Sequence, residues 1–191
     1  MEIRFREGIS EVIATTHNRR PNAAPMGIIN RGSFHIAVYK DSHTFLNIKK
    51  NHQLVANLVE DPVLYVRTAF EDLEPESFYF NKEALILKDA YAWVAFECSV
   101  HERPTQKSAI VELAPVRAAV LQRPVMPANR AFCAVLEATI LATRYEFLRD
   151  SDCLRRIDEY EHVVRRCGGT REFEAFEMLK TYLQEASSSK A

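Results

Sequence analysis

Glycine is scarce in this chain. Only five glycines occur among the 191 residues, namely Gly8, Gly27, Gly32, Gly168 and Gly169. Their spacing forms neither G-x-x-x-x-G-K-[ST] nor G-x-G-x-x-G, the two glycine-rich loops that hold phosphates. If the chain binds a nucleotide, its phosphate must therefore be held in some other way.

Three further absences narrow the class of protein. With 25 basic and 26 acidic residues, the chain has no excess of positive charge that would favour nucleic acid or an anionic membrane as a partner. The four cysteines form no C-x-x-C pair and no histidine lies at zinc-like spacing, so we expect reduced thiols and no metal site. The N-terminus lacks a signal-peptide core, and no apolar run approaches the roughly 18 residues of a membrane helix. We therefore expect a soluble, cytoplasmic protein.

Short strands dominate the first part of the chain. Residues 34–39, 54–59 and 94–100 alternate apolar side chains with smaller or polar ones, and turn-forming residues such as 60–62 separate them. Several short strands at close spacing favour a barrel or a sandwich. Residues 69–88 interrupt the alternation with an acidic loop and an apolar stretch, which we interpret as an excursion of helical character beside the barrel.

After Pro127 the apolar residues recur every three and four positions, as is typical of amphipathic helices. We expect one helix with Pro127 near its first turn, a second from Ser151 as N-cap to Cys167, and a third after Thr170. A glycine pair ends the second helix. The sequence thus predicts three parts: a β-barrel over residues 1–126, a helical subdomain over 127–187 and a disordered tail over 188–191.

Two neighbouring segments combine polar and very small side chains. Thr15 and Thr16 end one expected strand, and Asn22, Ala23 and Ala24 begin the next. A strand pair joined by a turn would place them side by side and leave backbone groups open to a flat ligand. The alternative, which this segment alone favours, is a plain hairpin with small residues for close packing.

The segment from residue 40 to 50 could bind an anion without glycine. Ser42 or Thr44 can cap a short helix, whose free N–H groups and dipole favour a negative charge at that point. Asn47 adds an amide one turn later, and Lys49 or Lys50 adds positive charge. The alternative is an ordinary capped helix with solvated lysines.

Polar residues elsewhere also need partners. Asn57 lies within an apolar strand, where its amide must meet either a ligand or a backbone group. Asn129 and Arg130 begin a helix that is rich in small residues. Arg130 could reach a bound anion, or the helix could simply be a packing seam with surface ion pairs.

Taken in order, these segments resemble the flavin-reductase-like FMN-binding split barrels. The shared order is a strand with Thr15-Thr16, the segment Asn22–Gly27, the segment Ser42–Ile48 and a strand with Asn57. The stretch after Asn57 and the helix that starts at Asn129 resemble, more narrowly, a small family of archaeal-type flavoproteins without an assigned reaction. The resemblance covers roughly residues 8–150.

The resemblance implies a mainly β, α+β fold: a six-stranded split β-barrel of the FMN-binding type, followed by a C-terminal helical segment. It also implies a homodimer with one FMN per subunit near the interface. The residues that it assigns to the flavin ring or ribityl chain are Thr15, Thr16, Asn22, Ala23 and Ala24. Those assigned to the phosphate are Ser42, Thr44 and Asn47, with help from Lys49 or Lys50, while Asn129 and Arg130 approach from the helical part. The turn His17–Pro21 is bulkier and more basic than the family's short, glycine-containing turn.

Three hypotheses of function remain open. The first is an FMN-dependent oxidoreductase, whose substrate the family association links to pterin-dependent one-carbon chemistry. The second is a non-catalytic flavin-binding module, such as an electron carrier, a flavin chaperone or a sensor. The third is a barrel without flavin that has a structural role. An open face over the flavin favours the first and a sealed ring the second, whereas failure to bind added FMN favours the third.

Overall fold

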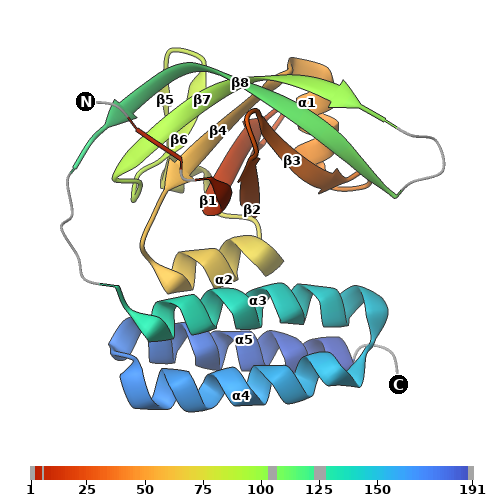
Figure 1. Cartoon of the computed structure of the whole chain (residues 1–191), viewed down its shortest axis with the longest axis vertical. Helices are drawn as coiled ribbons and strands as arrows, with labels where there is room; N and C mark the ends of the chain where they lie inside the picture. The colour runs from red at the N-terminus through yellow and green to blue at the C-terminus, as the bar shows by residue number, and fades with distance from the viewer. Residues whose placement is uncertain (1–2, 6, 103–106, 123–127, 189–191) are drawn as a thin grey trace. The chain divides into compact units, whose positions relative to one another are not determined.

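The computed structural model describes residues 3–5, 7–102, 107–122 and 128–188. The chain divides into two compact units (Figure 1). The units are Met1–Val59 with Asp72–Pro124, and Glu60–Glu71 with Val125–Ala191. The sequence-based boundary placed residues 1–126 together, whereas the observed division groups Glu60–Glu71 with the helices.

Six antiparallel strands close the barrel of the first unit, in the order β1-β2-β3-β8-β7-β4. They are β1 (Gly8–His17), β2 (Pro21–Asn30), β3 (Phe34–Tyr39), β4 (Gln53–Leu58), β7 (Ala92–His101) and β8 (Ser108–Val120). This barrel, with a helical segment after it, confirms the predicted α+β split-barrel fold.

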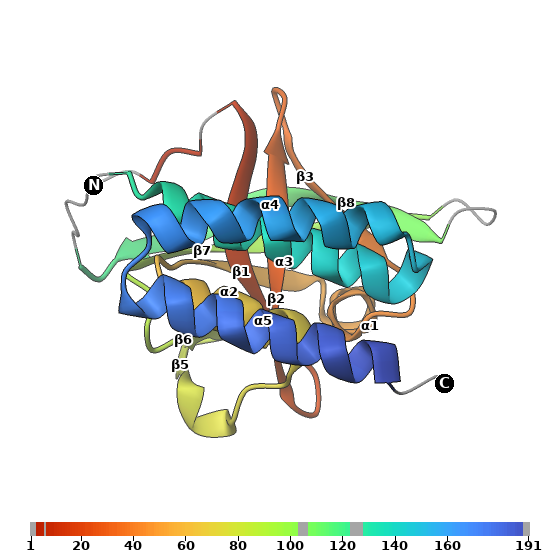
Figure 2. The same ribbon diagram turned by 90° about the horizontal axis from the view of Figure 1, so that it is seen from below.

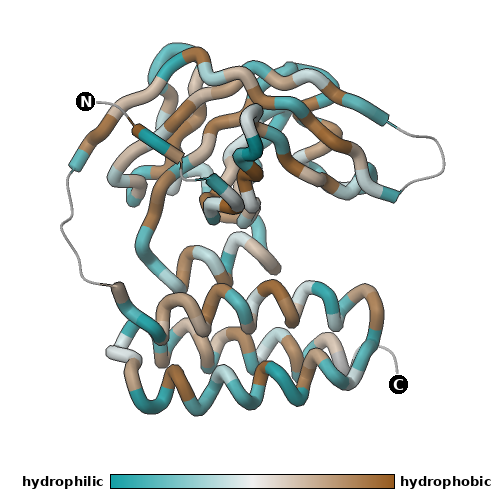
Figure 3. Tube along the Cα trace, viewed as in Figure 1, coloured by the Kyte–Doolittle hydropathy of each residue, from teal (hydrophilic) through white to brown (hydrophobic). Residues whose placement is uncertain are grey.

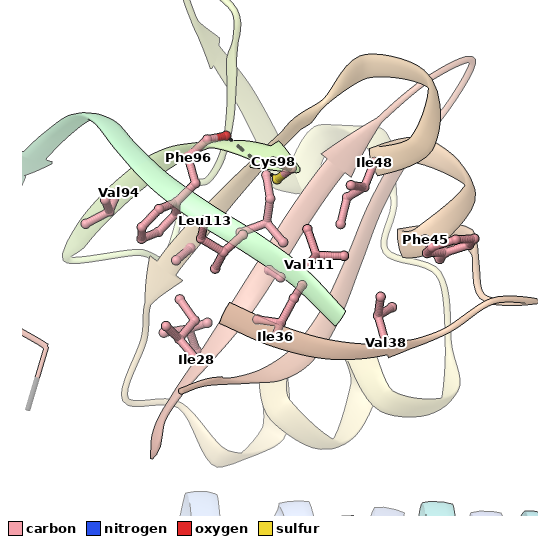
Figure 4. Close-up of a cluster of buried hydrophobic side chains, with 14 of the residues drawn as sticks. Ile28, Ile36, Val38, Phe45, Ile48, Val94, Phe96, Cys98, Val111 and Leu113 are labelled. Carbon is pink, nitrogen blue, oxygen red and sulfur yellow. Dashed lines mark hydrogen bonds between the residues drawn. The ribbon is translucent and has the colours of Figure 1, made fainter. Parts of the chain in front are cut away.

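Alternate residues of the strands fill the barrel interior. Figure 3 shows brown and teal or pale positions following one another along the strands, which is the pattern of a sheet with one buried face. In Figure 4, Ile36 of β3, Phe96 of β7 and Val111 of β8 belong to one cluster of buried side chains. Full burial of such a side chain contributes about 1.5–3 kcal/mol relative to leaving it exposed.

The barrel has a split between β2 and β3. Within the described residues, these strands pair only at Ile29–His35 and Asn30–Phe34, next to their connecting turn. β2 pairs along its whole length with β1 on its other side. The edge of β2 over its first eight residues, Pro21–Ile28, therefore carries backbone groups without a strand partner in β3.

Helix α1 (His43–Asn51) follows β3 directly and packs against β1 and β2. Ser42 is its N-cap, because the Ser42 hydroxyl accepts a hydrogen bond from the backbone N–H of Phe45 at 3.2 Å. The predicted capped helix is thus confirmed. The side chains of Phe45 and Ile48 enter the barrel core, which fixes the face that α1 turns toward the strands.

The excursion in the barrel sequence is a hairpin. Its strands are β5 (Phe78–Asn81) and β6 (Ala84–Leu87), preceded by the short 3-10 turn η1 (Pro75–Ser77). The expectation of helical character was therefore wrong for most of this segment. All four residues of β6 are buried, so the hairpin packs firmly against the barrel wall.

Asn57 joins this hairpin to the barrel. Its side chain is fully buried, and its Oδ1 accepts a hydrogen bond from the backbone N–H of Leu87 at 2.9 Å. Its Nδ2 donates to the Thr15 hydroxyl and to the carbonyl of Ile13, each at 3.0 Å. The Thr15 hydroxyl in turn donates to the carbonyl of Leu85 at 2.6 Å. The partners of Asn57 are thus protein groups, which answers the question that the sequence left open.

Four helices form the described part of the second unit. They are α2 (Pro62–Phe70), α3 (Arg130–Leu148), α4 (Ser151–Cys167) and α5 (Thr170–Ser188). Figures 1 and 2 show α3, α4 and α5 with nearly aligned axes, and their apolar faces meet in a common core with that of α2. No helix in the described part of the chain is long and apolar enough to cross a bilayer.

The three C-terminal helices were predicted, with small differences at their ends. Asp150, not Ser151, caps α4, because its carboxylate accepts a hydrogen bond from the N–H of Asp152 at 2.9 Å. Pro127 lies outside the described residues, and α3 begins at Arg130. The expected tail began at residue 188, but Ser188 belongs to α5, and residues 189–191 lie outside the described part.

Replacing Asn57 by Ala should destabilise the protein by roughly 2–3 kcal/mol, because it leaves the buried N–H of Leu87 without an acceptor and Thr15 without a donor. The free energy of unfolding in urea measures this loss. The matched control is Asn81→Ala, since the Asn81 side chain is exposed and its substitution should change stability by less than about 0.5 kcal/mol. A loss below about 1 kcal/mol for Asn57→Ala would contradict the structural role of this amide.

Cys98 should resist alkylation in the folded protein. Its side chain lies in the barrel core (Figure 4), and burial raises the pKa of its thiol to about 12, so almost no nucleophilic thiolate forms near neutral pH. Cys133 is exposed and should react first with iodoacetamide at a pH of about 8. Mass spectrometry of the labelled peptides distinguishes the two sites, and Cys133→Ser removes the early label. Equal rates for Cys98 and Cys133 would contradict the burial.

Candidate functional site

Four of the predicted site residues meet in one buried polar cluster, formed by Thr16 of β1, Asn22 of β2, and Thr44 and Asn47 of α1. The Asn22 amide donates to the Thr44 hydroxyl at 3.0 Å and to the Thr16 hydroxyl at 3.2 Å. The Asn47 amide donates to the same Thr16 hydroxyl at 3.1 Å. The cluster therefore ties α1 to the end of the β1–β2 hairpin.

Local geometry explains why these side chains meet. Thr16 and Asn22 are directly opposite each other in the β1–β2 register, so their side chains share one face of the sheet. Thr44 and Asn47 are three residues apart on a helix and lie on the same side of α1. All four residues are buried, and hydrogen bonds between them offset the cost of removing their polar groups from water.

Thr15 lies apart from this cluster. Neighbouring residues of a strand point to opposite faces, and the Thr15 hydroxyl joins Asn57 and the β5–β6 hairpin instead. Ala23 is opposite Thr15 in the register and is buried, whereas Ala24 is half-buried. The structure thus divides the predicted ring-binding set between the two faces of the hairpin, and contact of these residues with a flavin stays a prediction.

The start of α1 lies beside the split in the barrel. The Ser42 hydroxyl donates to the carbonyl of Tyr39 at 2.7 Å while it caps the helix, so Ser42 is held at the end of β3. The first N–H groups of a helix have no intrahelical acceptor, and they favour an anion at this point. Lys49 lies two turns later, where its ammonium binds Glu102 at 2.7 Å and lowers the pKa of that exposed carboxyl. Its predicted help to a phosphate remains untested.

Asn129 and Arg130 belong to the helical unit. The Asn129 side chain caps α3 by accepting from the N–H of Ala131 at 2.9 Å, and its amide donates to Glu172 at 3.0 Å. Both residues, with Glu172 and Cys167, line a pocket of about 550 Å³ in this unit. Their predicted approach to a flavin stays a prediction.

A cleft of about 540 Å³ opens in the barrel unit at the end of β1. Its lining comes from the end of β1, the end of α1, the start of β4 and the tip of the β5–β6 hairpin: Thr15, Thr16, His17, Lys50, Asn51, Gln53, Leu54, Val55, Phe80, Lys82, Glu83 and Leu85. Its volume is within the usual range for small-molecule sites. Sequence reasoning found its threonines but missed Phe80 and Lys82, since no local signal showed that the hairpin would return to β1.

Known structures support the same architecture. An FMN-bound protein from Methanosarcina mazei has 40% sequence identity to this chain, with a TM-score of 0.86 over 92% of this chain and 95% of that one. A putative flavin reductase with a split-barrel domain from Shewanella frigidimarina has 15% identity and a TM-score of 0.51 over 59% of this chain and 67% of that one. An NADH:FAD oxidoreductase from Streptomyces globisporus has 12% identity and a TM-score of 0.50 over 59% and 74%, respectively. The last two show the shared fold alone.

The family comparison covers both units of the chain. The N-terminal domain described as "Protein of unknown function (DUF447)" matches residues 10–122, and the C-terminal part of the same family matches residues 129–181. The protein from Methanosarcina mazei is described as a member of this family as well. The resemblance drawn from the motifs is confirmed, and the chain belongs to the DUF447 family.

Proposed function

We propose that this chain is an FMN-binding flavoprotein that acts as an oxidoreductase. The observation that carries the proposal is the 40% identity, over 92% of the chain, to a DUF447 protein that was crystallised with FMN. The shared fold of flavin reductases adds to it but does not identify a reaction.

The split in the barrel supports an FMN site between β2 and α1. A flavin ring needs N–H and C=O groups for its pyrimidine edge, and the edge of β2 next to Asn22, Ala23 and Ala24 carries such groups without pairing to β3. The first turn of α1, with Ser42 and Thr44, lies across the split from this edge and offers N–H groups to a phosphate. Small side chains on β2 leave room for a flat ring.

The redox chemistry itself belongs to the flavin, which exchanges hydride or electrons with its partner. The residues of the chain bind and orient the cofactor. A comparison of the reduction rate of bound and free FMN by a hydride donor tests the enzymatic half of the proposal. Equal rates would favour a non-catalytic flavin module.

The cofactor assignment is tested by titrating the purified protein with FMN and with riboflavin, which lacks the phosphate. Saturation at one FMN per chain is the expected result. The double variant Ser42→Ala/Thr44→Ala should bind FMN at least about 100-fold more weakly, since two phosphate hydrogen bonds of roughly 1.5–3 kcal/mol each are lost. Its affinity for riboflavin should fall by less than about fivefold.

Asp150→Ala is the matched control, because it removes an equivalent N-cap from α4 in the helical unit. It should leave both affinities unchanged. Equal losses of FMN and riboflavin binding in the Ser42/Thr44 variant would contradict the phosphate assignment. No binding of either ligand by the natural sequence would contradict the cofactor.

We also infer that the chain forms a homodimer. Its barrel exposes large apolar side chains on the outer face of neighbouring strands, with Tyr39 of β3 at 57% and Ile110 of β8 at 41% exposure. Light scattering should give twice the chain mass of 21.9 kDa at micromolar concentration. Ile110→Asp should shift the protein toward monomer, because a charge would be buried at the contact. A monomer with the natural sequence would contradict the inference.

A further inference from the structure

A groove of about 560 Å³ lies within the helical unit, where α2, α3 and α5 end. Its apolar lining includes Phe70 of α2, Phe147 of α3, and Tyr182 and Leu183 of α5. The volume is within the usual range for small-molecule sites. Among the described residues that line the groove, none was assigned to the flavin, so the groove needs an explanation of its own.

One aromatic wall of the groove is already in place. The rings of Phe70 and Tyr182 are stacked, with 4.8 Å between their centroids and 21° between their planes. The Tyr182 hydroxyl donates a hydrogen bond to the carboxylate of Glu71. Burial, together with this carboxylate, raises the pKa of Tyr182, so the hydroxyl stays protonated and keeps this bond at neutral pH. A ligand therefore meets two rings whose positions are fixed before it binds.

Three helices direct their negative ends at the groove. Figure 1 shows α2, α3 and α5 running in the same direction, and residues at or next to the end of each helix line the groove. The C-terminal end of a helix carries a partial negative charge from its unpaired carbonyl groups. The last turns of α3 and α5, as far as the structure describes them, contain no basic residue. Three such ends at one place favour a cation.

Carboxylates add to this negative field. Glu71, Glu146 and Glu185 line the groove together with a single basic side chain, that of Arg149, which gives the described lining a formal charge of −2. The Arg149 guanidinium donates to the carbonyl of Ala186 at 2.9 Å. Its charge thus lies at the end of α5 and compensates only part of the negative field.

The rim of the groove is apolar and open to solvent. Phe147 is 70% exposed and its neighbour Leu148 is 71% exposed, the two highest values among the large apolar side chains described as exposed. Covering such surface is favourable, at about 25 cal/mol for each Å² removed from water. The face of an aromatic ring also attracts a cation. The groove therefore combines apolar area with a preference for positive charge.

A second copy of this chain does not match the groove. A symmetric contact would place the same surface of both copies face to face. Glu146 and Glu185 of one groove would then approach their counterparts, and like charges repel. The complementary occupant is instead positively charged.

From these observations we propose that the groove is a binding site for an organic ammonium ion with an apolar or aromatic body. The body of the ligand contacts Phe147, Tyr182 and Leu183. Its nitrogen faces Glu146, Glu185 and the negative helix ends. The proposal does not depend on the assignment of FMN.

Three compounds with the same apolar body serve as probes: 4-phenylbutylamine, 4-phenylbutanol and 4-phenylbutyrate, which are positive, neutral and negative at neutral pH. Each is titrated into the full chain without FMN, and methyl NMR signals of leucine follow the binding. The Leu183 signal should shift, whereas that of Leu54 in the barrel core should not. The amine should bind at least about fivefold more tightly than the alcohol, and the carboxylate more weakly than both. Added salt should weaken binding of the amine alone.

Variants separate the charge from the ring. Glu146→Gln should weaken binding of the amine about threefold and leave the alcohol unchanged, since only the amine is charged. Asp158→Asn is the matched control, because it removes the same charge from an exposed position on α4 outside the groove. Phe147→Ala should weaken the amine and the alcohol alike, by about threefold, since both lose the ring contact. Its control is Phe173→Ala, which removes a ring that is 41% exposed near the start of α5.

Three results would overturn the proposal. They are equal affinities for the amine, the alcohol and the carboxylate, an equal loss of amine binding in Glu146→Gln and Asp158→Asn, and binding of the amine that leaves the Leu183 signal unshifted. Selective binding of the amine by a protein that binds no FMN would support the groove while contradicting the proposed cofactor.

Discussion

Two buried hydrogen-bond networks, one on each face of β1, hold the site together. The Thr16 hydroxyl accepts from the amides of Asn22 and Asn47 and so fixes α1 to the strands. The Thr15 hydroxyl donates to the carbonyl of Leu85 and so fixes the β5–β6 hairpin. Because neighbouring side chains of a strand point to opposite faces, a Thr-Thr pair can anchor one element on each side. Both the helix and the hairpin that line the cleft are therefore positioned by one dipeptide.

The elements that local signals define were predictable from the sequence. Ser42 was a recognisable N-cap, and the helices after residue 128 had clear apolar periods. Helix α2 was missed, because its β-branched and aromatic residues resemble a strand, while Asp61 as a cap and Pro62 at the first position are short signals that favour a turn as well. The hairpin that follows was missed for a related reason, since its apolar residues were too few to show a period.

Of the candidate site, only the contacts that follow from the pairing of neighbouring strands were predictable from the sequence. The first strand of the hairpin ends near Thr16 and the second begins near Asn22, so the turn brings these two residues together, whatever packs around them. Which threonine faces which element depends on contacts distant in sequence, such as that of Thr15 with Leu85, and no local pattern encodes them. The role of Asn57 was open for the same reason, because its main acceptor and donor partners lie on another strand and on the hairpin.

The two ends of α1 differ in what they can bind, and this difference explains the distribution of charge around it. At its start, unpaired N–H groups and the helix dipole favour an anion, so a phosphate can be held with hydroxyls such as that of Ser42 and without glycine. At its end the dipole is negative and opposes an anion. Lys49 and Lys50 lie in this last turn and complement the negative end of the dipole, where Lys49 pairs with Glu102 and Lys50 donates to the Asn18 amide. Helix α1 therefore favours an anion at its start, while the lysines at its other end stabilise the helix itself.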